Sequence, residues 1–146
     1  MFEKILYPTD FSDVSRKALD YVKHLKEVGT KEVVVLHVID IREIGSALRH
    51  SGGALDFQKV LEKFKQEAEK ETKAIQTELK KIGFDVKVRI EQGIPFTDIL
   101  RVEEEEDISI TILGSHGKSC VEEMLLGSVS EKVVRKSHRP VLVIRR

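Results

Sequence analysis

Apolar positions along this chain alternate between short continuous runs and longer helical stripes. Continuous runs rich in Val and Ile predict strands covered on both faces, as in a parallel sheet. Apolar residues three and four positions apart predict helices with one buried face. Strands are predicted at 4–8, 32–39, 86–90, 108–113 and 141–144. Helices are predicted from about Ser12 to Gly29, from about Leu55 to Ile82, from Pro95 to Val102 and from Ser128 onward.

Strand and helix patterns alternate through the whole chain, which predicts an α/β fold with a doubly wound parallel sheet and helices on both faces. The long second helix also has the length of a coiled coil, but Gly83 and the strand after it favour packing on the sheet. Its predicted inner face is Phe57, Val60, Leu61, Phe64, Ala68, Ile75 and Leu79. The first helix has the stripe Val14, Ala18, Tyr21, Val22, Leu25 and Val28.

Three segments depart from this regular pattern. The polar, glycine-containing stretch from Asp40 to Gly53 is predicted to be a long mobile loop. The acidic run from Glu103 to Asp107 lies at a helix end where the dipole disfavours negative charge, which predicts a solvated surface rather than a metal site. The last strand, Val141 to Ile144, is apolar on both faces. At a sheet edge it would need a cover, which a two-fold copy could supply; a central strand of a monomer is the alternative.

Composition narrows the class of protein. The 146 residues suit a single domain over 1–146, and 25 Lys and Arg residues balance 25 Asp and Glu residues, unlike the basic excess of nucleic-acid binders. No apolar run approaches the ~20 residues of a membrane helix, and the first residues lack the pattern of a signal peptide. The single cysteine, Cys120, excludes an intrachain disulfide and fits a reducing cytoplasm, where we expect the protein to be.

The best candidate for chemistry is a glycine-containing segment after the fourth predicted strand. It reads Gly114-Ser-His-Gly117, then nine residues, then Gly127-Ser128 at the start of the last helix. Glycine lets backbone N–H groups approach an anion closely, and a helix N-terminus adds unpaired N–H groups and partial positive charge. The segment therefore predicts a phosphate site. Ser128 with Glu131 also matches a capping box, which alone would account for the serine.

Other motifs fit this chain poorly. Gly117-Lys118-Ser119 resembles the end of a P-loop, but the first glycine of that motif would fall at Ile112. A dinucleotide fingerprint would need glycine at His116, and a Gly-x-Ser-x-Gly nucleophile elbow is absent from the sequence. Cys120 is expected to be an ordinary thiol. Surface or packing roles rather than zinc binding are expected for His24, His37, His50 and His138.

Taken together, these segments resemble the ATP-binding branch of the universal stress protein family, over essentially the whole chain. The resemblance lies in residues 5–10, 36–38 and 93–95 and in the glycine segment. The family signature is Gly, two residues, Gly, nine residues, then Gly with Ser or Thr, which Gly114, Gly117, Gly127 and Ser128 satisfy. The resemblance implies an adenine nucleotide alpha hydrolase-like fold of strand order 3-2-1-4-5 and a homodimer joined through Val141 to Ile144.

The resemblance also implies a nucleotide site across the first and fourth strands, occupied by ATP, ADP or AMP with Mg²⁺ or Mn²⁺ on the phosphate oxygens. Asp10 would hydrogen-bond the adenosine end, and backbone groups near Val38 would contact adenine. Pro8 and Thr9 would line the part of the site that holds the base and ribose. Asp10 has an alternative role as a cap of the first helix.

At the other end of the implied site, small residues would hold the phosphates, and Lys118 stands where many relatives have arginine. The implied phosphate residues are Gly117, Gly127, Ser128 and Val129, with Gly114 and His116 lining the ribose and the turn.

The expected function is that of a dimeric ATP-binding sensor or regulator in the stress response, without enzymatic activity. ATP is expected to order the segment Lys118–Leu126. One alternative is a slow ATPase or phosphotransferase using the same pocket, for which Glu122 and Glu123 are the nearby carboxylates in the sequence. Another is a dimeric scaffold that binds AMP or a different ligand.

Overall fold

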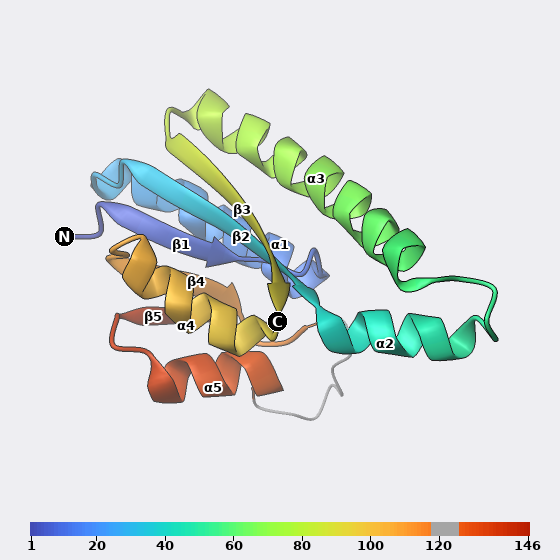
Figure 1. Cartoon of the computed structure of the whole chain (residues 1–146). Helices are drawn as coiled ribbons and strands as arrows, with labels where there is room; N and C mark the ends of the chain where they lie inside the picture. Colours follow the sequence, from blue (N-terminus) through green and yellow to red (C-terminus); the bar gives the residue numbers. More distant parts are fainter. Residues whose placement is uncertain (118–125) are drawn as a thin grey trace.

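Five parallel strands form one sheet in the order β3-β2-β1-β4-β5 (Figure 1). This is a computed structural model that describes residues 1–117 and 126–146. The strands are β1 (Lys4–Pro8), β2 (Glu32–Asp40), β3 (Asp85–Gly93), β4 (Ile110–Gly114) and β5 (Val141–Ile144). The predicted fold class and strand order are confirmed. Because β5 lies at the sheet edge, the alternative of a central last strand is wrong.

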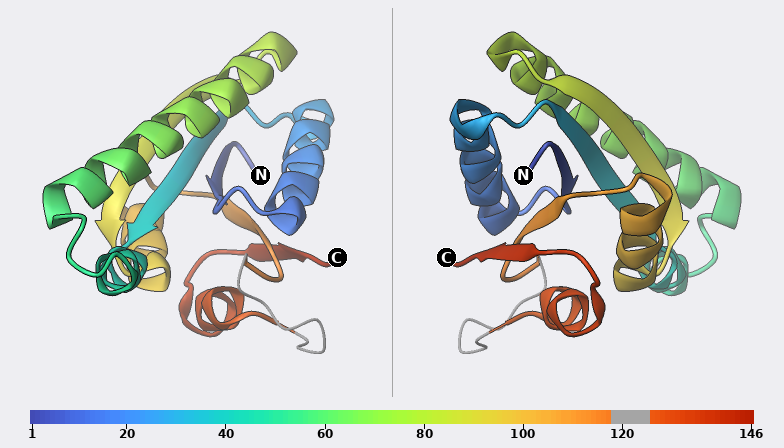
Figure 2. Two further views of the ribbon diagram at one scale, coloured as in Figure 1. Left: turned by 90° about the vertical axis from the view of Figure 1, so that its right-hand side faces the viewer. Right: turned by 90° about the vertical axis from the view of Figure 1, so that its left-hand side faces the viewer.

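Helices cover both faces of this sheet (Figure 2). On one face lie α1 (Asp13–His24), followed by the short 3-10 helix η1 (Leu25–Val28), and α3 (Phe57–Ile82). On the other face lie α4 (Pro95–Glu105) and α5 (Ser128–Lys136). Side chains alternate along β2, so Val33 and Val35 join the cluster under α1 and α3, whereas Val34 and Leu36 join the cluster under α4 and α5. Packing of α3 on the sheet, rather than in a coiled coil, is confirmed.

Three residues of the predicted helix stripes are not in the core. Tyr21 is 47% exposed, Val28 69% and Phe57 47%. The buried stripe of α1 is centred on Ala18 and Val22 and extends to Leu19, which leaves Tyr21 at its margin. Val28 lies in the 3-10 turn after α1, and Phe57 is the first residue of α3. The other predicted residues of both helices are buried or half-buried against the core, and Ser15 and Thr72 are buried as well, although the predicted stripes did not include them.

The stretch from Asp40 to Gly53 was predicted to be a loop, and this prediction is wrong. It contains helix α2 (Ile41–His50), whose N-cap is Asp40, since the Asp40 carboxylate accepts a hydrogen bond from the Arg42 amide at 2.9 Å. Ile44 is buried against α3 in a small cluster with Ile39, Val60 and Leu61. An Asp cap with Glu43 three residues later is a helix-start signal, which the glycines at 45, 52 and 53 obscured.

The acidic run from Glu103 to Asp107 is only in part the solvated surface that was predicted. Glu103 is 1% exposed, and its carboxylate accepts hydrogen bonds from the hydroxyls of Thr111 and Ser137, both at 2.7 Å. Glu106 is 8% exposed and accepts a hydrogen bond from the Lys87 ammonium at 2.7 Å. The pair at i and i+3 faces the sheet because residues three apart share one side of a helix. The other three acidic residues are exposed.

Within the part of the chain that the structure describes, no helix combines the length and the apolar character needed to cross a bilayer.

Candidate functional site

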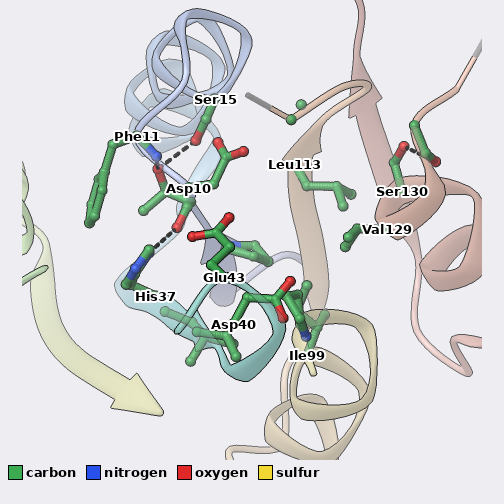
Figure 3. Close-up of a pocket in the computed structure, with 18 of the residues that line it drawn as sticks. Asp10, Phe11, Ser15, His37, Asp40, Glu43, Ile99, Leu113, Val129 and Ser130 are labelled. Atoms are coloured by element: carbon green, nitrogen blue, oxygen red, sulfur yellow. Dashed lines mark hydrogen bonds between the residues drawn. The ribbon is translucent and has the colours of Figure 1, made fainter. Parts of the chain in front are cut away.

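A cavity of about 300 Å³ opens at the carboxyl ends of β1, β2 and β4, where the strand order reverses around β1 (Figure 3). Ligands of open α/β sheets bind at such a point. The cavity brings together all the predicted site residues that the structure describes. These are Pro8, Thr9, Asp10, Val38, Gly114, His116, Gly117, Gly127, Ser128 and Val129. Lys118, Cys120, Glu122 and Glu123, and with them most of the segment Lys118–Leu126, lie outside the described residues.

Residues 8–12, which we call the strand-one turn, form one wall of the cavity. The Thr9 hydroxyl accepts a hydrogen bond from the Phe11 amide at 3.0 Å, and the Asp10 carboxylate accepts one from the Ser12 amide at 3.0 Å. These bonds hold Phe11 in the left-handed region, with φ of +65°. Ser12, rather than Asp10, is the N-cap of α1, since its hydroxyl accepts a hydrogen bond from the Ser15 amide. The capping role considered for Asp10 is therefore wrong.

Buried hydroxyl groups stabilise this turn by hydrogen bonds from the protein interior. The Tyr7 hydroxyl donates to the Ser15 carbonyl at 2.7 Å, and the Ser15 hydroxyl donates to the Thr9 hydroxyl oxygen at 2.5 Å. Burial raises the pKa of the Tyr7 hydroxyl, which keeps it protonated as a donor. Thr9 is only 6% exposed, so its hydroxyl shapes the turn from within.

His37 also lines the cavity, a role that the sequence did not indicate. Its Nδ1 lies 2.8 Å from the Thr9 carbonyl oxygen, and its ring stacks on Phe11 with the ring centroids 4.4 Å apart. Because a carbonyl oxygen only accepts, Nδ1 carries the hydrogen in this bond. His37 therefore has the packing role that was expected for it, because its ring packs against Phe11 of the strand-one turn. Alternation along β2 places His37 and Val38 on opposite faces of the sheet. The cavity therefore extends across the carboxyl ends of the strands from one face to the other.

The opposite wall is what we call the glycine cradle, residues 114–117 and 127–130. Gly114, Gly117 and Gly127 all have φ outside the left-handed region. A Cβ at these sites would make close contacts: 2.8 Å from Val14 Cγ1 at Gly114, 2.8 Å from Asp10 Oδ2, the end of a side chain, at Gly117, and 3.1 Å from the Ser115 carbonyl oxygen at Gly127. The spacing of the glycines therefore reflects three close approaches between chain segments, beyond the freeing of amides predicted from the sequence.

Helix α5 begins inside this cradle. Its N-cap is Gly127, and its first backbone hydrogen bond runs from the Glu131 amide to the Gly127 carbonyl at 3.0 Å. The amides of residues 128–130 therefore precede the helical hydrogen-bond ladder and carry the positive end of the helix dipole. Ser128 is an exposed first helical residue, so the capping box predicted for it is wrong. This end of the cavity offers hydrogen-bond donors to an anion.

Residues of α2 and α3 complete the rim of the cavity. Those on α2 fall in the stretch 40–53 that was predicted to be a loop. Figure 3 shows Glu43 between Asp10 and Asp40. The Arg42 guanidinium donates to both carboxylate oxygens of Asp40, at 2.9 and 2.7 Å. Burial by itself would raise the pKa of Asp40, but these hydrogen bonds outweigh it and hold the pKa below its ordinary value. The rim residues that the sequence did not indicate are Asp40, Arg42, Glu43, Phe64, Glu67 and Ala68.

The lining of the cavity combines two kinds of chemistry. The apolar side chains of Val38, Ile99, Leu113 and Val129 suit a flat, weakly polar group. The glycine cradle suits an anion. Among residues 1–117 and 126–146, no group of three or more His, Cys, Asp or Glu side chains is placed to hold a metal ion. The lining thus accommodates a ligand that combines a planar base with an anionic group.

Comparison with known proteins gives a consistent result. The universal stress protein family matches residues 1–145. Universal stress protein MJ0577 of Methanocaldococcus jannaschii is 44% identical, with 100% of this chain and 96% of the relative covered. A solved structure of MJ0577 superposes with a TM-score of 0.90 over 100% of this chain and 97% of that one.

Two more distant solved structures of the family contain nucleotides. A universal stress protein in complex with cAMP is 21% identical with a TM-score of 0.66, covering 99% of this chain and 97% of that one. The universal stress protein from Archaeoglobus fulgidus in complex with dAMP is 18% identical with a TM-score of 0.66, covering 99% and 98%. At these identities the likeness shows the common fold. The family match over nearly the whole length and the 44% identical relative show that the chain belongs to the universal stress protein family.

Proposed function

We propose that this protein is a cytoplasmic, dimeric regulator of the stress response whose cavity binds ATP. One observation carries the proposal: the strand-one turn and the glycine cradle meet in a single cavity, where the missing Cβ of Gly117 lets the Asp10 carboxylate approach the cradle. The complexes of two family members with cAMP and dAMP support the adenine nucleotide class of ligand.

In the proposed complex, adenine lies between the strand-one turn and Val38, with Asp10 hydrogen-bonding the adenosine end. The phosphates lie at Gly117, Gly127, Ser128 and Val129, where the amides at the start of α5 donate hydrogen bonds. The described residues present no three-ligand cluster for a metal. Mg²⁺ or Mn²⁺ would accordingly take its ligands from phosphate oxygens and water.

The regulator is proposed to bind ATP without using it as a substrate. Of the described rim carboxylates, Asp40 is held by the Arg42 guanidinium, which disfavours its use as a base. In a turnover assay with labelled ATP, we expect far less than about one hydrolysis per second. Turnover well above that rate would favour the alternative of an ATPase or phosphotransferase.

The proposed dimer forms through the edge strand β5. Leu142 is 37% exposed there, and Val141 and Val143 are half-buried. An apolar edge strand exposes unpaired backbone groups, which a two-fold copy would pair. We expect the wild type to sediment as a dimer and Leu142→Lys as a monomer. A monomeric wild type would contradict this part of the proposal.

The nucleotide itself is tested by calorimetry and by mass spectrometry of any ligand released on denaturation. We expect Mg-ATP to bind the wild type, and Gly117→Val and Asp10→Ala to abolish binding because both change the contact between cradle and turn. The matched controls are Gly45→Ala on α2 and Asp20→Ala on α1, both outside the cavity. Unchanged affinity in both cavity variants would overturn the assignment of the site, and release of AMP or another ligand would favour a scaffold.

A further inference from the structure

Ser130 is a residue of the cavity wall that the sequence did not indicate. It is the third residue of α5 and is 3% exposed. Its hydroxyl lies 2.6 Å from the Ser115 carbonyl oxygen and 3.1 Å from the Gly127 carbonyl oxygen. In Figure 3, a dashed line marks a hydrogen bond of the Ser130 hydroxyl near the start of α5.

The chemistry of these contacts limits what Ser130 does. A serine hydroxyl has one hydrogen, and carbonyl oxygens only accept, so that hydrogen is committed to the Ser115 carbonyl and in part to the Gly127 carbonyl. An ionised phosphate oxygen also only accepts. The Ser130 hydroxyl therefore has no hydrogen left for a phosphate, in contrast to the amides at the start of α5.

The Ser115 carbonyl connects the two parts of the glycine cradle. It accepts a second hydrogen bond from the Gly127 amide, also at 2.6 Å. Ser115 itself is 0% exposed, and its amide donates to the Ile144 carbonyl of β5 at 2.8 Å. Both chain segments that would surround the phosphates are thus tied to one buried carbonyl at the end of the sheet.

The close approach at Gly127 depends on the same carbonyl. A Cβ on Gly127 would lie 3.1 Å from the Ser115 carbonyl oxygen, so the absent side chain and the Ser130 hydroxyl act on one contact. A serine that bonds only its own helix would stabilise α5 alone. The bond to Ser115, fifteen residues away, instead fixes where α5 begins relative to β4.

We infer that Ser130 is a positioning residue that holds the start of α5 against the end of β4 and so sets the phosphate-binding geometry of the cavity. This rests on the proposed function, because the phosphates define what is positioned. Removing the hydroxyl loosens the Gly127 segment and weakens contacts to phosphates, while contacts to adenosine at the strand-one turn stay intact.

The first experiment needs no ligand. In Ser130→Ala, we expect the Gly127 amide to exchange its hydrogen at least about fivefold faster than in the wild type, as local opening becomes easier. The internal control is the Thr9 amide in the strand-one turn, which donates to the Leu36 carbonyl at 2.9 Å and keeps its exchange rate. Unchanged exchange at Gly127 would overturn the inference, whatever the protein binds.

The second experiment compares ligands with and without phosphates by calorimetry. Ser130→Ala is expected to bind Mg-ATP about tenfold more weakly and adenosine within about twofold of the wild type. Ser130→Thr, which keeps the hydroxyl, restores ATP affinity. The control is Thr72→Ala on α3, which removes another buried hydroxyl that donates within its helix, to Ala68 at 2.7 Å, and leaves the ratio of the two affinities unchanged.

Equal losses for ATP and adenosine in Ser130→Ala would mean a general structural role and would overturn the inference. So would the same loss of ATP affinity in Ser130→Ala and Ser130→Thr, since volume rather than the hydroxyl would then be responsible. Failure of the wild type to bind ATP would refute the proposed function instead, and the exchange measurement at Gly127 would still decide the role of Ser130.

Discussion

The two walls of the cavity are built in different ways. The strand-one turn is held by side chains, since hydroxyls and a carboxylate at Thr9, Asp10 and Ser15 satisfy backbone and side-chain partners. In the glycine cradle, three glycines that lack a Cβ permit close contacts with neighbouring segments of the chain, and the Ser130 hydroxyl adds a side-chain hydrogen bond. The first wall depends on hydrogen-bonding side chains, whereas the second depends above all on the small size of its glycines.

This difference explains which wall is recognisable in a sequence. A position where a Cβ would press on a neighbouring segment favours glycine, so the cradle has a fixed glycine spacing that a motif records. A hydroxyl network accepts several arrangements of Ser and Thr and has no such spacing. The comparison predicts that substitutions of the cradle glycines fail by steric overlap, whereas turn variants fail by leaving buried polar groups without partners.

The largest effect is expected at Gly114. In Gly114→Val the new Cβ would meet the Val14 backbone carbon at 3.0 Å and the Ser15 amide nitrogen at 3.1 Å, neither of which can rotate away. We expect the free energy of unfolding to fall by about 2–3 kcal/mol in urea denaturation. In the control Gly45→Ala, the nearest atom is the end of the Arg49 side chain at 3.4 Å, and stability rises by about 0.5–1 kcal/mol. Wild-type stability in Gly114→Val would refute the steric explanation.

A smaller effect is expected at Ser15, beneath the strand-one turn. Ser15→Ala removes the hydroxyl that bonds the Thr9 hydroxyl, at a site that is 3% exposed. Loss of this buried bond costs about 1–2 kcal/mol of the free energy of unfolding, measured by urea denaturation. Thr77→Ala, at an exposed hydroxyl of α3, changes stability by less than about 0.5 kcal/mol. If both variants behave alike, the turn does not depend on its buried hydroxyls.

The smallest effect concerns alkaline pH and Tyr7. Burial raises the pKa of Tyr7 in the folded protein, whereas an unfolded tyrosine ionises near about pH 10. The associated stability is complete below about pH 10 and is lost as the pH rises through the higher folded pKa. Tyr7→Phe should therefore have a shallower loss of stability than the wild type between about pH 9 and 11. Tyr21→Phe, at a half-exposed tyrosine, serves as the control for the loss of a tyrosine hydroxyl.

Much of the fold could be predicted from local patterns. The apolar run of β2 indicated a strand buried on both faces, and the resemblance to a family supplied the strand order that the structure confirms. Helix α2 was missed because the glycine and serine residues within it are also typical of loops. Its absence from the prediction removed Asp40, Arg42 and Glu43 from the expected site.

Three further omissions share one physical cause, which is that the placement of a polar residue depends on distant partners. Glu103 is buried because hydroxyls on β4 and after α5 reach its carboxylate, and an acidic run by itself does not reveal them. His37 lines the cavity because Phe11 folds back over its ring. Ser130 was missed for the same reason, since its partner Ser115 lies fifteen residues earlier in the chain.

The contact between Gly117 and Asp10 has a consequence for how such chains diverge. Two segments far apart in the sequence share one small volume, so a larger residue at the first is tolerated only with a shorter or displaced side chain at the second. The residues at the two positions are therefore expected to change together. Homologues that lack the proposed ligand are expected to differ at both positions together, with the same sheet and a filled cavity.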